Sequence, residues 1–201
     1  MDLIVRVARE RGLRWCNGGM HWYDFVIVIG GLVLWLTPFF LTGWGDSTLQ
    51  RIDRRARWGM LLEFGAVGLM LASCLWAGPP QPWRVVASVV WFGLATLLSA
   101  TATRALGRHL RFDAAIGTEH ELVRQGPYRL VRHPIYTSVL CALWGIGFMG
   151  ASPLLFGVAT VACLAGTEIR VWTEDRLLAA RFGEQFREYR RSTRAYVPFL
   201  R

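Results

Sequence analysis

Long stretches without a charged residue constrain this chain more than any other feature of its sequence. Residues 85–103 carry no charge, and neither do the 34 consecutive residues 134–167. An apolar stretch of about 18 or more residues is typical of a membrane-spanning helix. The sequence therefore predicts an all-α, polytopic transmembrane bundle. The length of 201 residues, 53% of them hydrophobic, allows one compact bundle and hence a single domain, residues 1–201.

About five spans are expected. They cover residues 25–42, 59–76 and 85–103, and a helical hairpin within 134–167 that turns at residues 150–153. The fifth span would start near Pro153 and reach about Trp172. From there we expect a polar, cytosolic C-terminal helix that ends before Pro198. Residues 1–22 read as an amphipathic segment on the membrane surface, with no cleavable signal peptide.

The charges indicate how the spans are oriented. All 23 basic residues are arginine, and the formal net charge is +9. With five spans, the loop 43–57, the linker 104–133 and the C-terminal tail share one Arg-rich face, which the positive-inside rule places in the cytoplasm. Four arginines near the N-terminus would lie on the other side and oppose this topology. No nucleic-acid recognition motif accompanies the basic charge, so membrane lipids are the expected partners.

A few charges fall at membrane depth. Glu63 lies near one end of the second span, so it either reaches the interface or faces a polar cavity. Arg170 and Glu174 share one helical face, so they form an ordinary i,i+4 ion pair or part of a functional site. The four cysteines form no CxxC motif or Cys/His cluster, and no metal site is predicted.

The polar segment 120–136, HELVRQGPYRLVRHPIY, stands out between these apolar stretches. Pro134 suits the first position of a helix, and the proline disfavours helical angles at His133. His133 is therefore expected at the mouth of a membrane helix whose first N–H groups attract anions, such as the carboxylate of a zwitterionic ligand.

This segment resembles the signature of the isoprenylcysteine carboxyl methyltransferase family and its phospholipid methyltransferase relatives. A second stretch, Arg170-Val-Trp-Thr-Glu174-Asp175 followed by Phe182-Gly183, Tyr189 and Pro198-Phe199, resembles the family's R-xxx-E-E, FGxxYxxY and PF pattern. The likeness covers residues 110–201, about half of the chain. The short chain resembles the five-span prokaryotic members, which implies the inner (plasma) membrane of a prokaryote, with the active site facing the cytoplasm.

The resemblance implies a methyltransferase that uses S-adenosylmethionine, with residues 1–103 as N-terminal spans and 104–201 as the catalytic half. It implies catalytic roles for Arg170 and Glu174, with Arg170 on the substrate. The implied cofactor-binding residues are His120, Glu121, Leu122, Val123, Tyr128, His133, Pro134, Ile135, Tyr136 and Glu174. Asp113 falls where the family places a further cofactor contact, often an amide. Asp175 replaces the second Glu of the family's pair and is expected to point elsewhere, while Arg132 either balances charge over the site or faces lipid phosphates.

The acceptor is less constrained than the cofactor. A lipophilic carboxylate is the leading interpretation, because the guanidinium of Arg170 could hold it bidentately. A phospholipid amine or a thiol remains open, as does a non-catalytic membrane scaffold or carrier. Thr137-Ser138 replaces the family's small-residue step containing glycine, and the chain is shorter than the eukaryotic enzymes that act on prenylated proteins. The sequence gives no oligomeric state.

Overall fold

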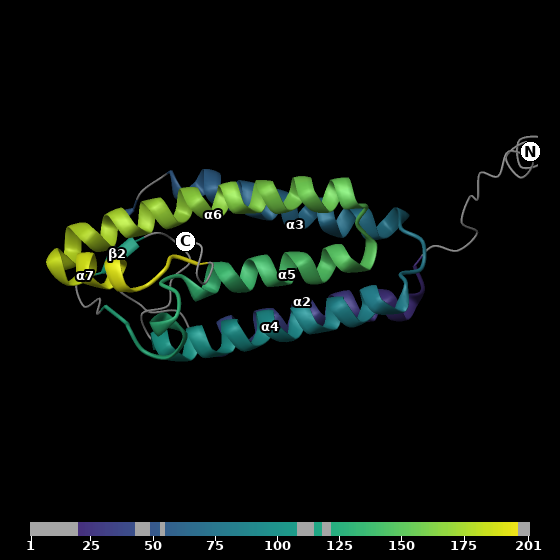
Figure 1. The fold of residues 1–201 in the computed structure, drawn as a ribbon, viewed down its shortest axis with the longest axis horizontal. Helices are drawn as coiled ribbons and strands as arrows, with labels where there is room; N and C mark the ends of the chain where they lie inside the picture. The colour runs from purple at the N-terminus through teal and green to yellow at the C-terminus, as the bar shows by residue number, and fades with distance from the viewer. Residues whose placement is uncertain (1–19, 43–48, 53–54, 108–114, 118–121, 197–201) are drawn as a thin grey trace, which may run out of the picture.

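The computed structural model describes residues 20–42, 49–52, 55–107, 115–117 and 122–196. Five apolar helices form an up-and-down bundle (Figure 1), namely α2 (Trp22–Leu41), α3 (Ala56–Trp76), α4 (Pro82–Leu106), α5 (Pro134–Gly150) and α6 (Pro153–Phe182). Four of these are long and apolar enough to cross a membrane, and α5 is shorter, at 17 residues. The predicted polytopic helical bundle is confirmed, and the ends of the first three spans lie within three residues of the predicted ends.

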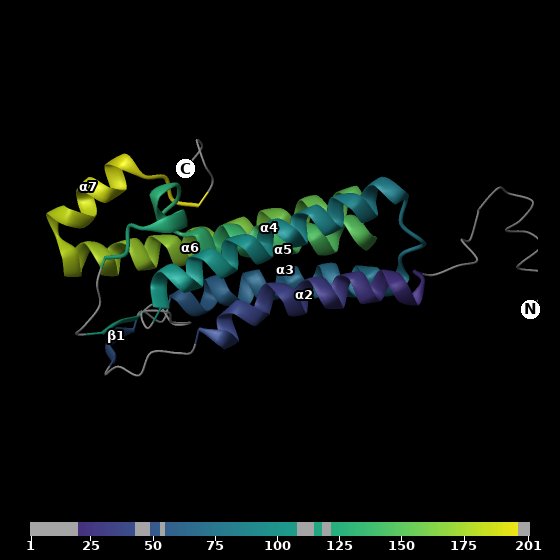
Figure 2. The same cartoon turned by 90° about the horizontal axis from the view of Figure 1, so that it is seen from below.

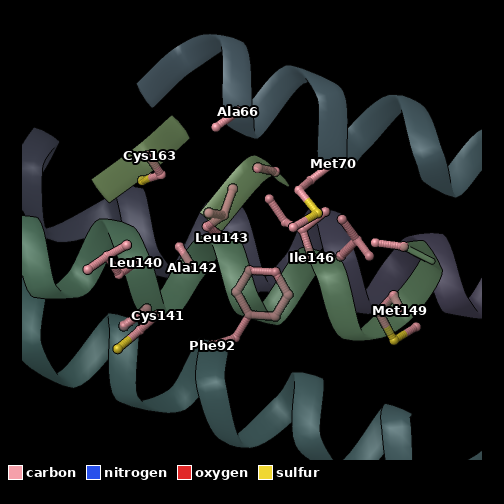
Figure 3. Packing of buried hydrophobic residues seen from close by; sticks show 14 of the residues in the cluster. Ala66, Met70, Phe92, Leu140, Cys141, Ala142, Leu143, Ile146, Met149 and Cys163 are labelled. Carbon is pink, nitrogen blue, oxygen red and sulfur yellow. The ribbon is translucent and has the colours of Figure 1, made fainter. Parts of the chain in front are cut away.

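Helix α5 forms the centre of the bundle and contacts α2, α3, α4 and α6. In Figure 1 it runs between the α3–α6 pair and the α2–α4 pair. Leu143 and Ile146 of α5 are completely buried, and Figure 3 shows them packed between Met70 of α3 and the ring of Phe92 of α4. A helix buried on every side explains why α5 could be recognised only as an apolar stretch without amphipathic periodicity.

The outer helices face outwards with apolar side chains, as expected for contact with lipid. Exposed residues include Ile29 and Leu34 on α2, Leu61 on α3 and Val86 on α4. Between the helices, hydroxyl groups donate to backbone carbonyls. The Ser88 hydroxyl donates to the Gly145 carbonyl at 2.7 Å. Hydrogen bonds of this kind hold neighbouring helices together within a membrane bundle.

Helices α3 and α6 approach most closely where two glycines face each other. A Cβ atom added to Gly59 would lie 2.6 Å from the Gly166 carbonyl oxygen, and one added to Gly166 would lie 2.6 Å from the Gly59 carbonyl oxygen. Only glycine allows the two backbones to come this close. The crossing brings the side chains that follow Gly166 on α6 against the first turns of α3.

The end of the bundle that holds the turns before α4 and α6 is closed by Arg84. Its guanidinium donates to the carbonyls of Gly147 and Ala151, at 3.3 and 2.6 Å. Gly147 lies in the last turn of α5, where its carbonyl also accepts from the Ala151 N–H at 2.9 Å, and Ala151 directly follows the helix. One arginine thereby binds two carbonyls at the C-terminal end of the central helix.

The opposite end carries the loops. A short antiparallel ladder joins β1 (Leu49–Ile52) to β2 (Ala115–Gly117), which the sequence did not predict. A 3-10 helix, η2 (Gly126–Arg129), precedes α5. The 30 residues of α6 extend about 45 Å, beyond the ~30 Å hydrocarbon layer. The helix ends at Gly183, whose φ of 53° favours glycine.

The chain then reverses into α7 (Glu184–Ser192), which lies over this end of the bundle (Figure 2). The predicted C-terminal helix is therefore present in two parts, because residues 173–182 continue α6 and α7 is a separate helix after Gly183.

Candidate active site

The site forms where α5 begins. Helix α5 starts at Pro134, as predicted, with His133 directly before it at φ −128° and ψ 62°. The His133 N–H donates to the Ala195 carbonyl at 2.7 Å. Residues 193–196, called the strap below, thus run beside residues 131–133. The Thr137 hydroxyl also donates to the Tyr196 carbonyl at 2.6 Å, so the strap is fixed to the first turn of α5.

The imidazole of His133 lies between two consecutive carboxylates of α6. Its Nε2 is 2.9 Å from Asp175 Oδ1, and its Nδ1 is 3.3 Å from Glu174 Oε2. Burial lowers the pKa of His133, but the hydrogen bonds and charges of Asp175 and Glu174 outweigh burial and raise it to about 9. His133 is therefore an imidazolium at neutral pH and holds both carboxylates in place.

Arg132 completes the charge balance around Asp175. Its guanidinium lies 2.9 Å from Asp175 Oδ2 and also donates to the Thr193 carbonyl of the strap. Both side chains are buried. Asp175 was expected to point away from the site, and that prediction is wrong, because α6 turns Glu174 and Asp175 to opposite sides of one imidazole. Of the two roles weighed for Arg132, the structure supports charge balance.

Glu174 is the accessible member of this group. Its side chain is 26% exposed, against 5% for His133 and 8% for Asp175. The Tyr136 hydroxyl donates to Glu174 Oε1 from the first turn of α5. Burial first, and then the negative charge of Glu174, raise the pKa of the Tyr128 phenol well above its usual value. A ligand entering from the loop end would meet Glu174 first.

A second ion pair lies deeper in the membrane. Arg170, about one helical turn below Glu174, pairs with Glu63 Oε2 at 3.2 Å, and its guanidinium lies over the Tyr136 ring at 5.0 Å. The Thr167 hydroxyl donates to the other Glu63 oxygen at 3.0 Å. Tyr136 thus connects the His133 group to the Arg170–Glu63 pair. Of the two positions considered for Glu63, the structure shows the interior and not the lipid interface.

The remaining predicted residues are placed as follows. Pro134 is buried and Ile135 half-buried in the first turn of α5, and Leu122 and Val123 are half-buried before η2. His120, Glu121, Asp113 and Pro198-Phe199 lie outside the described residues. Within the ranges that the structure describes, no group of three or more His, Cys, Asp or Glu side chains could hold a metal ion.

For two members of the site, Asp175 and Glu63, the sequence did not predict the contacts that the structure shows. The sequence predicts that Asp175 points elsewhere on the helix and is secondary, although an Arg-His pair at 132–133 calls for more than one carboxylate. Glu63 had a clearer signal, because an acid within an apolar span needs a cation, and Arg170 is the arginine expected at similar depth. The sequence did not show which face of each helix would meet.

Comparison with known proteins identifies a family model and several relatives that resemble this chain. The sequence model described as "Phospholipid methyltransferase" matches residues 83–185. The chain is 42% identical over 157 residues to the cobalt-zinc-cadmium resistance protein CzcN of Cupriavidus metallidurans, covering 77% of this chain and 68% of the relative. It is 30% identical to the methanethiol S-methyltransferase of Mycobacterium tuberculosis, covering 67% and 60%. A probable protein-S-isoprenylcysteine O-methyltransferase of Oryza sativa subsp. japonica is 31% identical over 84 residues, 41% of this chain and 43% of the relative.

Proposed function

The chain belongs to the phospholipid methyltransferase family and is a membrane methyltransferase, and we propose that it transfers the methyl group of S-adenosylmethionine to a lipophilic thiol at the loop end of its bundle. The observation that carries this proposal is the arrangement of Glu174. It is a partly exposed carboxylate, held by His133 and Tyr136, at the mouth of a buried helix. Such a group is positioned for a ligand and not for packing.

The residues present suit this cofactor. Glu174 can accept hydrogen bonds from an ammonium group or from ribose hydroxyls, and the N-terminus of α5 suits a carboxylate. The faces of Tyr136 and Tyr128 can attract a sulfonium cation. The bound cofactor supplies an electrophilic methyl group whose positive charge disappears as the methyl leaves.

The protein's own contribution is alignment and exclusion of water. His133 and Tyr136 fix both oxygens of Glu174, which positions the donor. Arg132 and Asp175 hold His133, and the strap closes the side of the site formed by residues 131–133. Arg170 and Glu63 lie deeper, on the side from which a lipophilic acceptor would come.

Among the acceptors, a thiol is favoured over the carboxylate that the sequence suggested. Arg170 is already paired with Glu63 inside the bundle, so a bound carboxylate would add an anion to a pair that is neutral. A thiol enters uncharged. Relatives named methanethiol S-methyltransferase are in line with this choice, whereas a name such as cobalt-zinc-cadmium resistance protein describes a phenotype and leaves the acceptor open.

The orientation we propose places this end of the bundle at the cytoplasmic face of a prokaryotic inner membrane. Trp172 is half exposed there, with the guanidinium groups of Arg55 and Arg176 at 5.8 and 5.5 Å from its ring. A tryptophan flanked by arginines is typical of a membrane boundary on the positive-inside face. Arg170 would then lie just inside that boundary.

Calorimetric titration with S-adenosylmethionine and S-adenosylhomocysteine, in detergent and in lipid nanodiscs, tests the cofactor site. We expect saturable binding to the wild type and at least about tenfold weaker binding to Glu174→Gln, since one charged hydrogen bond contributes more than 1.4 kcal/mol. Glu184→Gln is the matched control, because Glu184 also pairs with a cationic side chain, Arg187, but lies exposed on α7. Folded wild-type protein that binds neither ligand would refute the proposal.

The acceptor is tested by methyl transfer to a long-chain thiol, a long-chain carboxylic acid and an amino phospholipid, compared by kcat/KM. We expect the thiol to be the best substrate. A preference for the carboxylic acid would restore Arg170 to the role predicted from the sequence, and a preference for the amine would contradict both readings.

A further inference from the structure

We propose that Glu63 is the base that takes the proton from the thiol acceptor. This role rests on the proposed function above and assigns a catalytic residue to α3, the helix that packs across α6 at Gly59 and Gly166. A thiol reacts as a thiolate, and an alkyl thiol is mostly protonated at neutral pH. A thiol methyltransferase therefore needs a group that accepts this proton inside the membrane.

The contacts of Glu63 leave room for such a proton. Its Oε1 accepts from the Thr167 hydroxyl at 3.0 Å, and its Oε2 accepts from Arg170 at 3.2 Å. A carboxylate oxygen has two lone pairs, so each oxygen keeps one for a further donor. The carboxylate is only 5% exposed, so its charge depends on Arg170 and not on water.

The other carboxylates near the site are engaged differently. Glu174 and Asp175 both face the His133 imidazolium, and Asp175 also holds Arg132. Protonating Asp175 would leave the buried Arg132 without its carboxylate, and protonating Glu174 would remove one of the two carboxylates that hold His133. Glu168, on the neighbouring face of α6, accepts from the Tyr196 hydroxyl at 2.5 Å and so holds the strap. Glu63 differs from these carboxylates because its cationic partner, Arg170, can pair with the acceptor thiolate once Glu63 is protonated.

That exchange is the chemical step. The S–H bond of the acceptor breaks, its proton bonds to a Glu63 oxygen, and Arg170 turns from the neutralised carboxyl group to the new thiolate. The thiolate sulfur then forms a bond to the methyl carbon as the bond from that carbon to the sulfonium breaks. The products are a neutral thioether and the neutral thioether sulfur of the spent donor. Glu63 finally releases its proton to water and pairs with Arg170 again.

Several groups face Glu63 and set its charge environment. Arg170 and Glu174 approach it from α6, together with Cys163, and Tyr136 approaches it from α5. Arg170 is the nearest of these charges and opposes the negative charge of Glu174. The pH dependence of the reaction is therefore expected to follow proton transfer at Glu63 and ionisation of the acceptor.

The test is the pH profile of Glu63→Gln, which keeps the size of the side chain and an oxygen that can accept from Thr167. With an alkyl thiol at neutral pH, kcat should fall about 10²- to 10⁴-fold, the usual contribution of a general base. The rate of the variant should then rise tenfold per pH unit as the thiol ionises in solution. With an aryl thiol that is already ionised at neutral pH, the variant should approach the wild-type rate. Glu184→Gln should behave as wild type with both thiols.

Binding of S-adenosylmethionine separates the possible failures. The expected result is unchanged affinity in Glu63→Gln together with the altered pH profile. If the wild type methylates alkyl thiols and Glu63→Gln does so at the same rate and with the same profile, Glu63 is not the base, although the proposed function stands. Loss of cofactor binding in Glu63→Gln, or equal losses with alkyl and aryl thiols, would show a structural role and overturn the inference. A wild type without thiol methylation would refute the proposed acceptor itself.

Discussion

The close crossing of α3 and α6 gives a prediction whose magnitude follows from the structure. In Gly59→Ala, the new Cβ would lie 2.6 Å from the Gly166 carbonyl oxygen, about 0.8 Å short of the 3.4 Å at which ordinary contacts begin. The neighbouring atom is backbone, so the helices must move apart. Overpacking of this kind costs about 1–3 kcal/mol. The same Cβ would lie 2.6 Å from Arg170 Cγ, so the Arg170–Glu63 pair should be displaced as well.

The same helix supplies the control. Gly65 and Gly68 are exposed, and a Cβ added to either meets nothing within 4 Å. Alanine at these positions should stabilise α3 by up to about 1 kcal/mol through helix propensity alone. The difference between Gly59→Ala and Gly65→Ala then isolates the cost of the crossing. For a chain of this size, that cost corresponds to a fall in the unfolding midpoint of about 2–12 °C.

The assay can use the protein's own thiols. Cys74, Cys141 and Cys163 are buried, so a thiol-reactive fluorophore reports their exposure as the bundle unfolds. A Cys16→Ser background removes the remaining cysteine. We also expect Gly59→Ala to lose methyl transfer before it loses cofactor affinity, because Arg170 and Glu63 lie at the crossing and Glu174 does not. Equal midpoints for Gly59→Ala and Gly65→Ala would refute the reasoning.

Three further predictions concern charges. The pKa of His133 is raised from 6.5 to about 9, so its protonation stabilises the fold fully below pH 6.5. That contribution, up to about 3 kcal/mol, is lost as the pH rises through 9. The unfolding midpoint should fall over this range in the wild type but not in His133→Gln. Asp175→Asn should lower the unfolding free energy by about 3–5 kcal/mol, because it leaves Arg132 and His133 underpaired in a buried site, whereas Glu184→Gln should change it by less than about 1 kcal/mol. Arg84→Met should cost about 1–3 kcal/mol by removing the side-chain donor to the Gly147 and Ala151 carbonyls, and chemical denaturation would measure each loss.

The predictable part of the fold depended on signals that lie within single segments. Charge-free stretches located the helices, and Pro134 fixed the start of α5 because proline suits the first helical position. The sequence did not predict the break at Gly183, because the apolar pattern from Leu177 to Tyr189 continues across this glycine. Whether a glycine in such a pattern adopts a positive φ depends on how the following helix packs, and a single segment does not show that.

The site was predictable in its members and not in its pairings. Resemblance selected His133, Tyr136, Arg170 and Glu174, and the structure brings these together. Their partners depend on how the helices are rotated about their axes, which apolar sequences facing lipid leave nearly free. Glu63 and Arg170 are 107 residues apart, and only the Gly59–Gly166 crossing determines that they meet.

The strap also determines when the enzyme can become active during its synthesis. The backbone N–H groups of Arg132 and His133 pair with the carbonyls of Arg194 and Ala195, which are translated after every span. A nascent chain can therefore have all its helices in the bilayer while residues 131–133 still lack these partners. Assembly of the site must wait until the ribosome has released residue 196. Stalling or truncation before that point would leave a fully inserted but inactive protein.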